Sequence, residues 1–273
     1  MLIGCHVSIA GGVFNAPERA ADLGCEAMQI FTRSPQGGKA PELTPEVISK
    51  FNLKAKTYNL KATFVHTPYY INFASANNRI RYGSVSVLRD ELERASLLGA
   101  KYVMTHLGSA GELSVREASD KVIEMLKKTL EGYTGSTELL IENSAGTGNI
   151  IGHDFSEIAY ILKNIDHPKL TGICIDTQHS WASGYDWHDF ENTIKKIEKE
   201  IGIEKIKLIH ANDSKTELGS NKDRHEHIGK GLIGTDAFKN ITALANKHDI
   251  TMIIETEHDF VKEDIELIKS FRD

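Results

Sequence analysis

The sequence predicts an α/β fold in which a single domain, residues 1–273, forms a closed (β/α)8 TIM barrel. Eight short apolar segments of strand length recur along the chain, and an amphipathic helical pattern follows each of them. The repeat is about 34 residues, the length of one βα unit, and neither a linker nor a low-complexity segment interrupts it. Strands that alternate with helices favour a parallel sheet, and eight units close that sheet into a barrel.

The predicted strands are short apolar runs, most of which are followed by a polar residue. Helix boundaries are marked between them. Thr44 precedes Pro45, the order of an N-cap followed by proline at the first helical position, and Gly99 follows two leucines as a helix stop. The clearest amphipathic helix places Leu88 and Leu92 on one face and charged residues on the other. The eight predicted strands are Leu2–Val7, Ala27–Phe31, Ala62–Val65, Tyr102–Thr105, Leu139–Ile141, Gly172–Ile175, Ile206–Ile209 and Met252–Ile254.

Composition and cysteine usage indicate an ordinary globular protein. The chain is 40% hydrophobic and 26% charged, and no apolar run approaches the roughly 18 residues that span a membrane. No lysine or arginine precedes Arg19, so the N-terminus lacks the basic region of a secretory signal, and we expect a cytoplasmic location. Cys5, Cys25 and Cys174 are far apart, which argues against disulfides and a thiolate zinc site and predicts buried free thiols. The sequence gives no sign of an obligate protein partner.

A polar loop after one predicted strand gives the first sign of a metal site. The segment Lys207–Gly231 begins as an apolar strand and breaks at His210 into a long polar loop that carries Asp223 and His225. Neutral imidazole and carboxylate oxygen together suit zinc and similar ions. A single histidine at a strand end is more often a hydrogen-bonded structural residue, so the metal interpretation depends on the rest of the chain.

Polar residues just past other predicted strands extend the set, at intervals of 34 to 45 residues. In a barrel these positions meet at the C-terminal rim, where active sites of this fold are built. Four of the nine candidates are carboxylates, and burying such charge is costly unless cations compensate it. Three divalent ions would also offset the formal net charge of −6, which otherwise disfavours binding to nucleic acid. The candidate ligands are His66, His106, Glu142, Asp176, His179, His210, Asp223, His225 and Glu255.

The remaining seven histidines are weaker candidates. His6 lies at the end of the first predicted strand, where we expect at most a supporting role beside the ligands. His227 and His258 are close to predicted ligands in the sequence and are alternatives to them. The other four lie in or beside predicted helices and are expected at the surface or at helix caps. These four are His153, His167, His188 and His248.

Short motifs surround the candidate ligands along essentially the whole chain. They are G-C-H-V-S-I-A-G-G at 4–12, H-T-P-Y-Y-I-N at 66–72, T-H-L-G-S at 105–109, I-E-N-S-A-G at 141–146, D-T-Q-H at 176–179, H-A-N-D-S-K at 210–215, D-R-H-E-H-I-G at 223–229 and E-T at 255–256. In this order they resemble the endonuclease IV family, the trinuclear-zinc apurinic/apyrimidinic (AP) endonucleases. D-T-x-H, H-x-N-D-S-K and D-R-H-x-x-I-G are far more specific than any lone metal pattern.

The resemblance implies a zinc-dependent hydrolase with three zinc ions per chain, with manganese as an alternative at one position. The family hydrolyses the phosphodiester 5′ to an abasic site in duplex DNA by a metal-activated hydroxide and leaves a 3′-hydroxyl. Glu142 would bridge two of the ions and is the expected catalytic residue. The implied ligand groups are His66, His106 and Glu142; Glu142, Asp176, His210 and Glu255; and His179, Asp223 and His225.

The resemblance also implies residues that contact DNA. Tyr69 and Tyr70 match family positions that wedge into the duplex at the lesion, where the missing base has already removed stacking. Their ordinary alternative is packing on the barrel rim. Gln36 is a departure, because the family commonly carries an arginine there and a tryptophan nearby. Gly37 and Gly38 follow instead, which predicts a weaker grip on DNA by this loop.

Two other functions compete with this interpretation. A metal-dependent sugar isomerase or epimerase uses a related barrel with carboxylates and histidines on the rim, but fold alone does not assign chemistry. Nine ligands favour three metals, which an isomerase does not need. A catalytically silent protein that binds DNA lesions would be expected to have lost at least one ligand, and every ligand position here is filled by the expected residue type.

Overall fold

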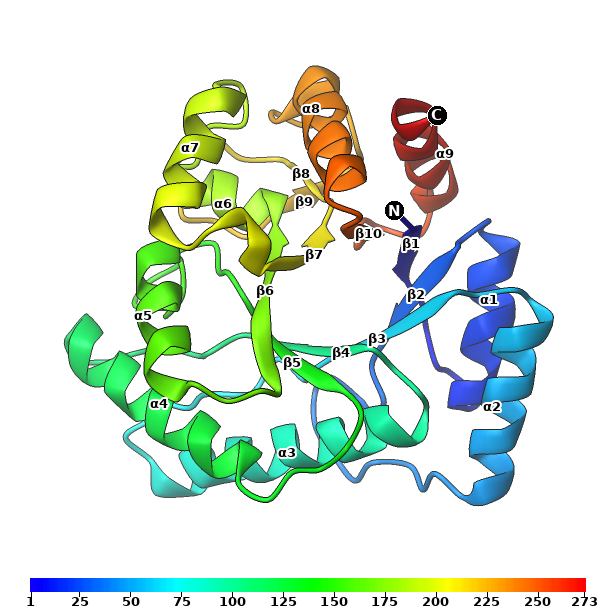
Figure 1. Cartoon of the computed structure of the whole chain (residues 1–273), viewed down its shortest axis with the longest axis horizontal. Helices are drawn as coiled ribbons and strands as arrows, with labels where there is room; N and C mark the ends of the chain where they lie inside the picture. The colour runs from blue at the N-terminus through cyan, green and yellow to red at the C-terminus, as the bar shows by residue number, and fades with distance from the viewer.

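A closed barrel of eight parallel strands forms the centre of the protein (Figure 1). The computed structural model describes residues 1–273. Around the barrel the strands follow the order β1-β10-β7-β6-β5-β4-β3-β2, and every neighbouring pair is parallel. The predicted TIM barrel is therefore confirmed. The barrel strands are β1 (Ile3–His6), β2 (Ala27–Ile30), β3 (Ala62–His66), β4 (Tyr102–Thr105), β5 (Glu138–Glu142), β6 (Leu170–Asp176), β7 (Ile206–His210) and β10 (Thr251–Ile254).

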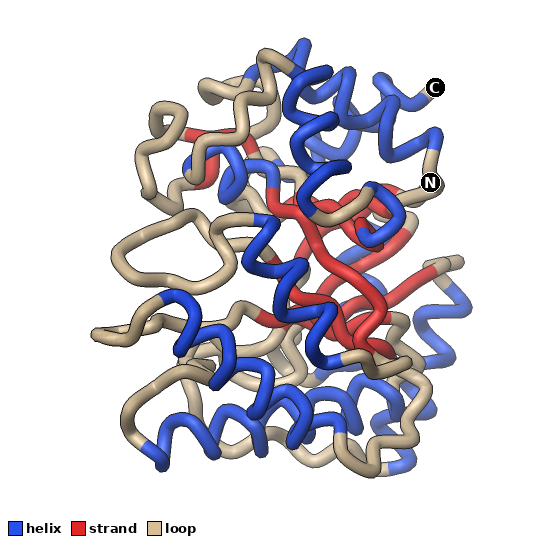
Figure 2. Tube along the Cα trace, turned by 60° about the vertical axis from the view of Figure 1, so that its left-hand side comes forward, coloured by secondary structure: helices blue, strands red, loops and turns tan.

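Helices surround the barrel, and Figure 2 shows them flanking the central strands. None of these helices combines the length and the apolar character needed to cross a membrane. The first and last elements lie side by side, because Arg272 near the C-terminus contacts Glu26 and the backbone of Met1. The helices are η1 (Val13–Asn15), α1 (Ala16–Asp22), α2 (Pro45–Thr57), α3 (Asn78–Leu97), α4 (Val115–Leu130), α5 (Phe155–Ile165), α6 (Thr177–Ala182), α7 (Phe190–Glu200), η2 (Ile203–Lys205), α8 (Gly234–Lys247) and α9 (Val261–Arg272).

The helix signals in the sequence correspond to the observed helix ends. The Thr44 hydroxyl accepts a hydrogen bond from the Val47 amide at 3.3 Å and so caps α2, which begins at Pro45. Helix α3 ends at Leu97, and Gly99 follows with a φ of 67°, a left-handed conformation that glycine adopts without strain. Leu88, on the predicted apolar face, is fully buried.

Two predictions about the strand ends were wrong in detail. Four of the predicted rim residues are the last residues of strands rather than the first residues after them. Glu142 pairs with Cys174 and Asp176 pairs with His210 in the sheet, so the hydrogen-bonded ladder extends as far as these side chains. The polar loop after β7 also contains a small antiparallel hairpin of β8 (Asp213–Ser214) and β9 (His225–Glu226). The backbone around these residues is therefore more regular than a loop.

The core has two parts, because successive side chains of a strand point to opposite faces of the sheet. One part fills the space between strands and helices and includes Phe51, Leu88 and Phe155. The other fills the barrel interior and includes Phe64, Met104 and Cys174. The interior is therefore packed with side chains, and polar groups gather above it at the C-terminal rim. All three cysteines are free and buried, as predicted.

Gly4 tests how closely two barrel strands approach, and Gly83 in helix α3 is the comparison. A Cβ atom at Gly4 in β1 would lie 1.9 Å from the carbonyl oxygen of Ala27, whereas one at Gly83 in α3 would meet nothing within 4 Å. We expect Gly4→Ala to lower the free energy of unfolding by about 1–3 kcal/mol. Gly83→Ala should raise it by about 0.5–1 kcal/mol. Urea unfolding midpoints measure both changes, and a Gly4→Ala variant as stable as the wild type would contradict the observed packing of β1 on β2.

Candidate metal centre

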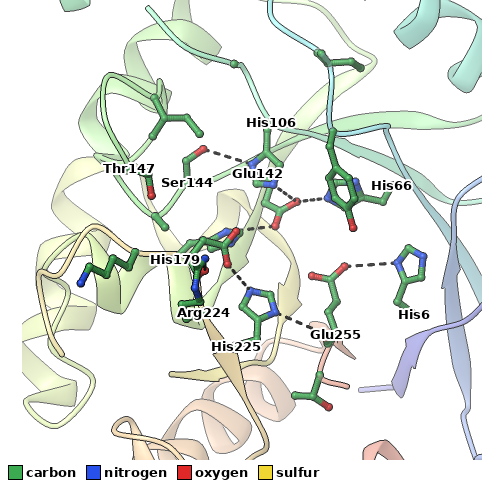
Figure 3. A pocket seen from close by; sticks show the side chains of 18 of the residues that line it. His6, His66, His106, Glu142, Ser144, Thr147, His179, Arg224, His225 and Glu255 are labelled. Atoms are coloured by element: carbon green, nitrogen blue, oxygen red, sulfur yellow. Dashed lines mark hydrogen bonds and ion pairs between the residues drawn. The ribbon is translucent and has the colours of Figure 1, made fainter. Parts of the chain in front are cut away.

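All nine predicted ligands lie in one site at the C-terminal rim. Figure 3 labels those of them that face the cavity most plainly: His66, His106, Glu142, His179, His225 and Glu255. The cavity there has a volume of about 760 Å³ and is open to solvent on one side. Its walls also contain His6, Tyr69 and Arg224. Six of the nine ligands lie at or just past the ends of barrel strands and are 34 to 45 positions apart in the sequence. They meet because the closed parallel barrel brings these strand ends to the same rim.

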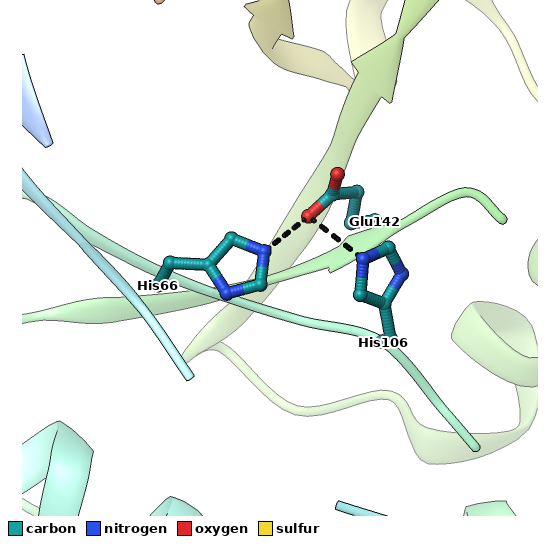
Figure 4. A group of neighbouring side chains, drawn as sticks. All are labelled: His66, His106 and Glu142. Carbon is teal, nitrogen blue, oxygen red and sulfur yellow. Dashed lines mark hydrogen bonds and ion pairs between the residues drawn. The ribbon is translucent and has the colours of Figure 1, made fainter. Parts of the chain in front are cut away.

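Glu142, at the end of β5, lies at the centre of the site and is fully buried. Its Oε2 atom is 2.9 Å from Nε2 of His66 and 3.6 Å from Nε2 of His106 (Figure 4). Its Oε1 atom is 2.9 Å from Nδ1 of His210. The two oxygens of one carboxylate therefore face two different sets of imidazoles, which is the arrangement that a bridging ligand requires.

The side chains form three overlapping groups whose ligand atoms lie within 4.8 Å of one another. Glu142 belongs to two of the groups, and Asp176 also belongs to two. Asp223 lies beside the third group, with its oxygens 3.4 Å from Nε2 of His179 and 3.3 Å from Nε2 of His225. The sharing of Asp176 was not predicted from the sequence. The groups are His66, His106 and Glu142; Glu142, Asp176, His210 and Glu255; and Asp176, His179 and His225.

Each of the five imidazoles has one ring nitrogen near a polar atom outside the carboxylate cluster and the other turned towards a carboxylate. This pattern is typical of metal-binding histidines, because the outer partner fixes the tautomer and the ring orientation. The outer partners are the carbonyl of Thr67 for His66 (2.6 Å), Oγ of Ser144 for His106 (3.4 Å), the carbonyl of Asn143 for His179 (3.1 Å), Oε1 of Gln29 for His210 (2.7 Å) and the carbonyl of Glu255 for His225 (3.5 Å).

His225 provides a direct test of whether these residues fit a metal ion. Its Nε2 atom is buried and has no hydrogen-bond partner in the protein. The nearest carboxylate oxygens, from Asp223 and Asp176, are 3.3 and 3.6 Å away. Ligand atoms around a tetrahedral zinc ion lie about 3.3 Å apart, given zinc–ligand bonds of about 2.0 Å. The residues therefore fit a zinc ion that would satisfy this nitrogen.

Neighbouring charges and burial shift the pKa values of several side chains in the site. Burial alone would raise the pKa of Glu142, but the facing imidazoles of His106, His210 and His66 hold it well below its usual range. Burial alone would lower the pKa of His179, but Asp176, Asp223 and Glu142 raise it to about 10. Burial dominates at His106 and lowers its pKa to about 4. Ionised carboxylates thus meet imidazoles that differ in protonation, and a metal ion would compete with those protons.

Two buried residues support the ligands, and neither was predicted from the sequence. The amide nitrogen Nδ2 of Asn212 donates to Oδ2 of Asp176 at 2.7 Å, while its Oδ1 accepts from the backbone of Glu255 at 2.9 Å. Asp213 accepts hydrogen bonds from five backbone amides, including those of Gly229 (2.9 Å) and Ile233 (2.8 Å). Asp213 thereby fixes the hairpin loop that carries Asp223 and His225. Asn212 and Asp213 both lie in the H-A-N-D-S-K motif, which is the sequence signal that could have identified them.

The seven other histidines differ in whether they line the cavity. His6 lines the cavity with its Nδ1 atom 3.6 Å from Glu255, which suits a supporting role. His258 also lines the cavity. His227 is not available as an alternative ligand, because its two nitrogens lie 2.7 Å from Asp264 and 3.1 Å from Asp259. The four histidines assigned to helices or their neighbourhoods do not line the cavity.

The three predicted DNA-contacting residues lie on two adjoining loops beside the cavity. The Tyr69 amide donates to the carbonyl of Pro35 at 3.3 Å, which joins the Tyr69–Tyr70 turn to the loop of Gln36. The Tyr69 side chain is 69% exposed although its ring contacts Phe31, and Tyr70 is 40% exposed. These tyrosines therefore remain accessible rather than packed away in the rim.

The comparisons with known proteins agree with this geometry. A family model described as the xylose isomerase-like TIM barrel matches residues 17–271. A protein of Cenarchaeum symbiosum (strain A) named probable endonuclease 4 is 37% identical over 283 residues, covering 100% of this chain and 99% of that relative. The crystal structure of endonuclease IV from Thermus thermophilus matches with a TM-score of 0.87 and 32% identity, covering 100% of this chain and 98% of that one.

These matches place the protein first in the class of xylose isomerase-like TIM barrels, whose rim here carries a histidine and carboxylate cluster. Within that class, the chain belongs to the endonuclease IV family. The resemblance that the motifs indicated is thus confirmed. The crystal structure of a D-tagatose 3-epimerase-like protein also matches, with a TM-score of 0.75 and coverage of 99% of this chain and 97% of that one. Its identity is 23%, so that likeness shows the fold alone.

One prediction concerns the coupling of metal binding to protons. Because the pKa of His179 is raised to about 10, its ring is protonated at pH 7 without metal, and a metal must displace that proton. Binding should therefore release protons and tighten as the pH rises from 6 to 9. Calorimetric titration of metal-depleted protein with zinc, in two buffers of different ionisation enthalpy, measures the release. Equal heats in both buffers would contradict the prediction.

Proposed function

We propose that this protein is a zinc-dependent AP endonuclease of DNA repair. It hydrolyses the phosphodiester 5′ to an abasic site in duplex DNA and leaves a 3′-hydroxyl. The observation that carries the proposal is the overlap of three ligand groups at Glu142 and Asp176, in a chain related over its full length to proteins named probable endonuclease 4. We further propose that residues 1–273 act as one domain and that the protein works with the DNA in the cytoplasm.

We propose that the three groups hold three zinc ions, with manganese as an alternative at one position. The donor set supports zinc, because it consists of imidazole nitrogens and carboxylate oxygens. His66, His106 and Glu142 would hold one ion, and Glu142 would share the second with Asp176, His210 and Glu255. The third would lie with His179, Asp223 and His225, near enough to Asp176 for a second shared ligand.

The residues of the chain would divide the work of cleavage among them. When bound, the metal ions supply Lewis acidity, which lowers the pKa of water and stabilises charge on the phosphate. Glu142 holds its two oxygens towards separate groups and so fixes the spacing between them. Tyr69 and Tyr70 project beside the cavity, where they can fill the gap left by a missing base. Exposed Lys222 and Arg224 at the cavity wall offer positive charge to the DNA backbone.

The sugar isomerase alternative fits the structure less well. Three epimerase or epimerase-like structures that match are 23%, 11% and 13% identical to this chain and share its fold. Three overlapping ligand groups exceed the one or two metals that proton transfer on a sugar needs. A silent lesion-binding protein is also disfavoured, since all nine candidate ligands are present and lie together.

The proposed function is tested with a duplex that carries one abasic site. We expect cleavage on its 5′ side, with a 3′-hydroxyl that a DNA polymerase extends, and loss of cleavage after removal of metal by a chelator. Adding back zinc should restore it. An undamaged duplex of the same sequence is the control. Absence of cleavage by the zinc-loaded protein would contradict the proposal, and isomerisation of a ketose would favour the alternative.

Glu142→Gln should nearly abolish cleavage and leave binding to abasic DNA largely intact. The amide keeps the shape of the side chain but loses the charge needed to bridge two ions, whereas most DNA contacts come from other residues. Glu157→Gln is the matched control, because Glu157 is a partly buried carboxylate outside the cavity. Cleavage rates and gel-shift affinities measure both effects after circular dichroism has verified folding. A Glu142→Gln rate within about tenfold of wild type would show that Glu142 is not the bridge.

Lesion binding should depend on Tyr69 and Tyr70, because Gln36 supplies no positive charge to the adjoining loop. Each aromatic platform that stacks on a base contributes on the order of 1–3 kcal/mol. We expect Tyr69→Ala and Tyr70→Ala to weaken binding to abasic duplex, and Gln36→Arg to strengthen it and steepen its salt dependence by about one phosphate contact. Tyr160→Ala, on the outer helix α5, is the control.

Affinities measured across a salt series decide between the outcomes. If both alanine variants bind abasic duplex as tightly as wild type does, the tyrosines do not wedge into DNA and only pack on the barrel rim. An unchanged affinity and salt slope in Gln36→Arg would show that this loop does not approach DNA.

A further inference from the structure

Gln29 is a fully buried polar side chain on β2 that the proposed mechanism does not use. Its Oε1 atom lies 2.7 Å from Nε2 of His210. Its Nε2 atom donates to Oε1 of Glu255 at 2.5 Å and lies 3.0 Å from Nδ1 of His6. One amide thus joins two of the four members of the group Glu142, Asp176, His210 and Glu255, although it lies 181 and 226 positions from them in the sequence.

The acceptor end of Gln29 determines which nitrogen of His210 is free. An amide oxygen only accepts, so the nitrogen of His210 that faces it must carry the proton. The other nitrogen, Nδ1, then presents its lone pair to the site. There it lies 2.9 Å from Oε1 of Glu142 and 3.2 Å from Oε2 of Glu255. Gln29 therefore selects the tautomer in which His210 can bind a metal ion.

The donor end of Gln29 acts on the carboxylate of Glu255. The amide nitrogen of Gln29 donates a hydrogen bond to Oε1 of Glu255, so that Oε2 of the same carboxylate faces His210. Neither a carboxylate nor an aliphatic side chain supplies both functions at this position, since a carboxylate cannot donate when ionised and an aliphatic side chain neither donates nor accepts. His6 extends the contact, because its ring lies beside both the amide of Gln29 and the carboxylate of Glu255.

We infer that Gln29 is a positioning residue that sets the tautomer of His210 and the orientation of Glu255, and so tunes metal binding by their shared group. The inference rests on the proposed metal-dependent function and deepens it. Outer partners of metal ligands typically change metal affinity by about 10- to 100-fold when they are removed. Because the hydrogen bonds of Gln29 go to His6, His210 and Glu255 and to none of the other ligand histidines, the effect should be confined to one of the three ions.

A merely structural role makes a different prediction. A buried amide that loses its partners destabilises the fold whether or not metal is present. If Gln29 has a positioning role, its replacement lowers the affinity of one ligand group for metal. The metal-free protein then loses no more stability than it does when another buried hydrogen bond is removed. Thr137 supplies that comparison, because its buried hydroxyl donates to the carbonyl of Ala100 at 2.7 Å and lies outside the cavity.

The experiment compares full-length wild type, Gln29→Leu, Gln29→Glu and Thr137→Val. Each zinc-loaded protein is dialysed against a series of chelator concentrations, and the zinc retained per chain is measured by elemental mass spectrometry. Thermal unfolding of the metal-depleted proteins and kcat and KM on abasic duplex are measured in parallel. We expect Gln29→Leu to lose one zinc ion at a chelator concentration about 10- to 100-fold lower than wild type does, with the other ions retained.

Gln29→Glu separates the two ends of the side chain. It still accepts from His210, but it replaces the donor to Glu255 with a carboxylate that repels it, so it should also lose the zinc ion of this group first while the other ions are retained. The expected kinetic change in both variants is a lower kcat with a similar KM, because the DNA contacts are untouched. Thr137→Val should retain zinc as wild type does while its metal-free unfolding temperature falls.

Several outcomes would overturn the inference. One is that Gln29→Leu retains zinc as wild type does. Another is that both Gln29 variants lose all their ions at once and that their metal-free forms are unfolded. These results leave the proposed function intact if wild type binds zinc and cleaves. Wild-type protein that neither retains zinc nor cleaves abasic DNA would overturn the inference and the proposed function together.

Discussion

The repulsion among four carboxylates at one end of the barrel is the constraint on which the site depends. Glu142 and Asp176 are fully buried, and an isolated buried carboxylate is very costly. Protonated imidazoles can balance that charge, as the pKa of His179, which the carboxylates raise to about 10, shows. Bound metal ions also balance the negative charge of the carboxylates, and they bind imidazoles in the neutral form. The cluster therefore makes physical sense as a cation site, and the unpartnered nitrogen of His225 agrees with this interpretation.

Holding such a cluster together requires a rigid frame and a second layer of hydrogen bonds. The frame is the closed ladder, which carries Asp176 and His210 as a directly paired couple at the ends of β6 and β7. The second layer consists of buried amides and one carboxylate that accepts only backbone donors. Asn212 joins Asp176 to the backbone of Glu255, just past β10, and Asp213 secures the hairpin loop. Barrels of the same class can thus host different chemistry by changing these rim residues while the packed interior is kept.

Much of this arrangement is predictable from the sequence, for identifiable reasons. Apolar runs at the spacing of a βα unit predict the barrel, and the convergence of parallel strands then brings residues such as His66 and Glu255 together. The β8–β9 hairpin is not predictable in this way, because two-residue strands carry no alternation of apolar and polar residues. Gln29 was missed because one polar residue within an apolar strand gives no indication of which rim side chains it will meet. The sharing of Asp176 depends on side-chain direction, which spacing does not define.

X-ray absorption spectroscopy at the zinc edge, combined with metal analysis of extensively dialysed protein, tests the central claim most directly. We expect about three zinc ions per chain, a coordination shell of nitrogen and oxygen without sulfur, and a zinc–zinc distance of about 3.5–4 Å from the pair that shares Glu142. A single ion per chain, a zinc–sulfur shell or the absence of a zinc–zinc distance would contradict it. A single ion or the absence of a zinc–zinc distance would mean that protons, rather than a bridged metal cluster, neutralise the buried carboxylates.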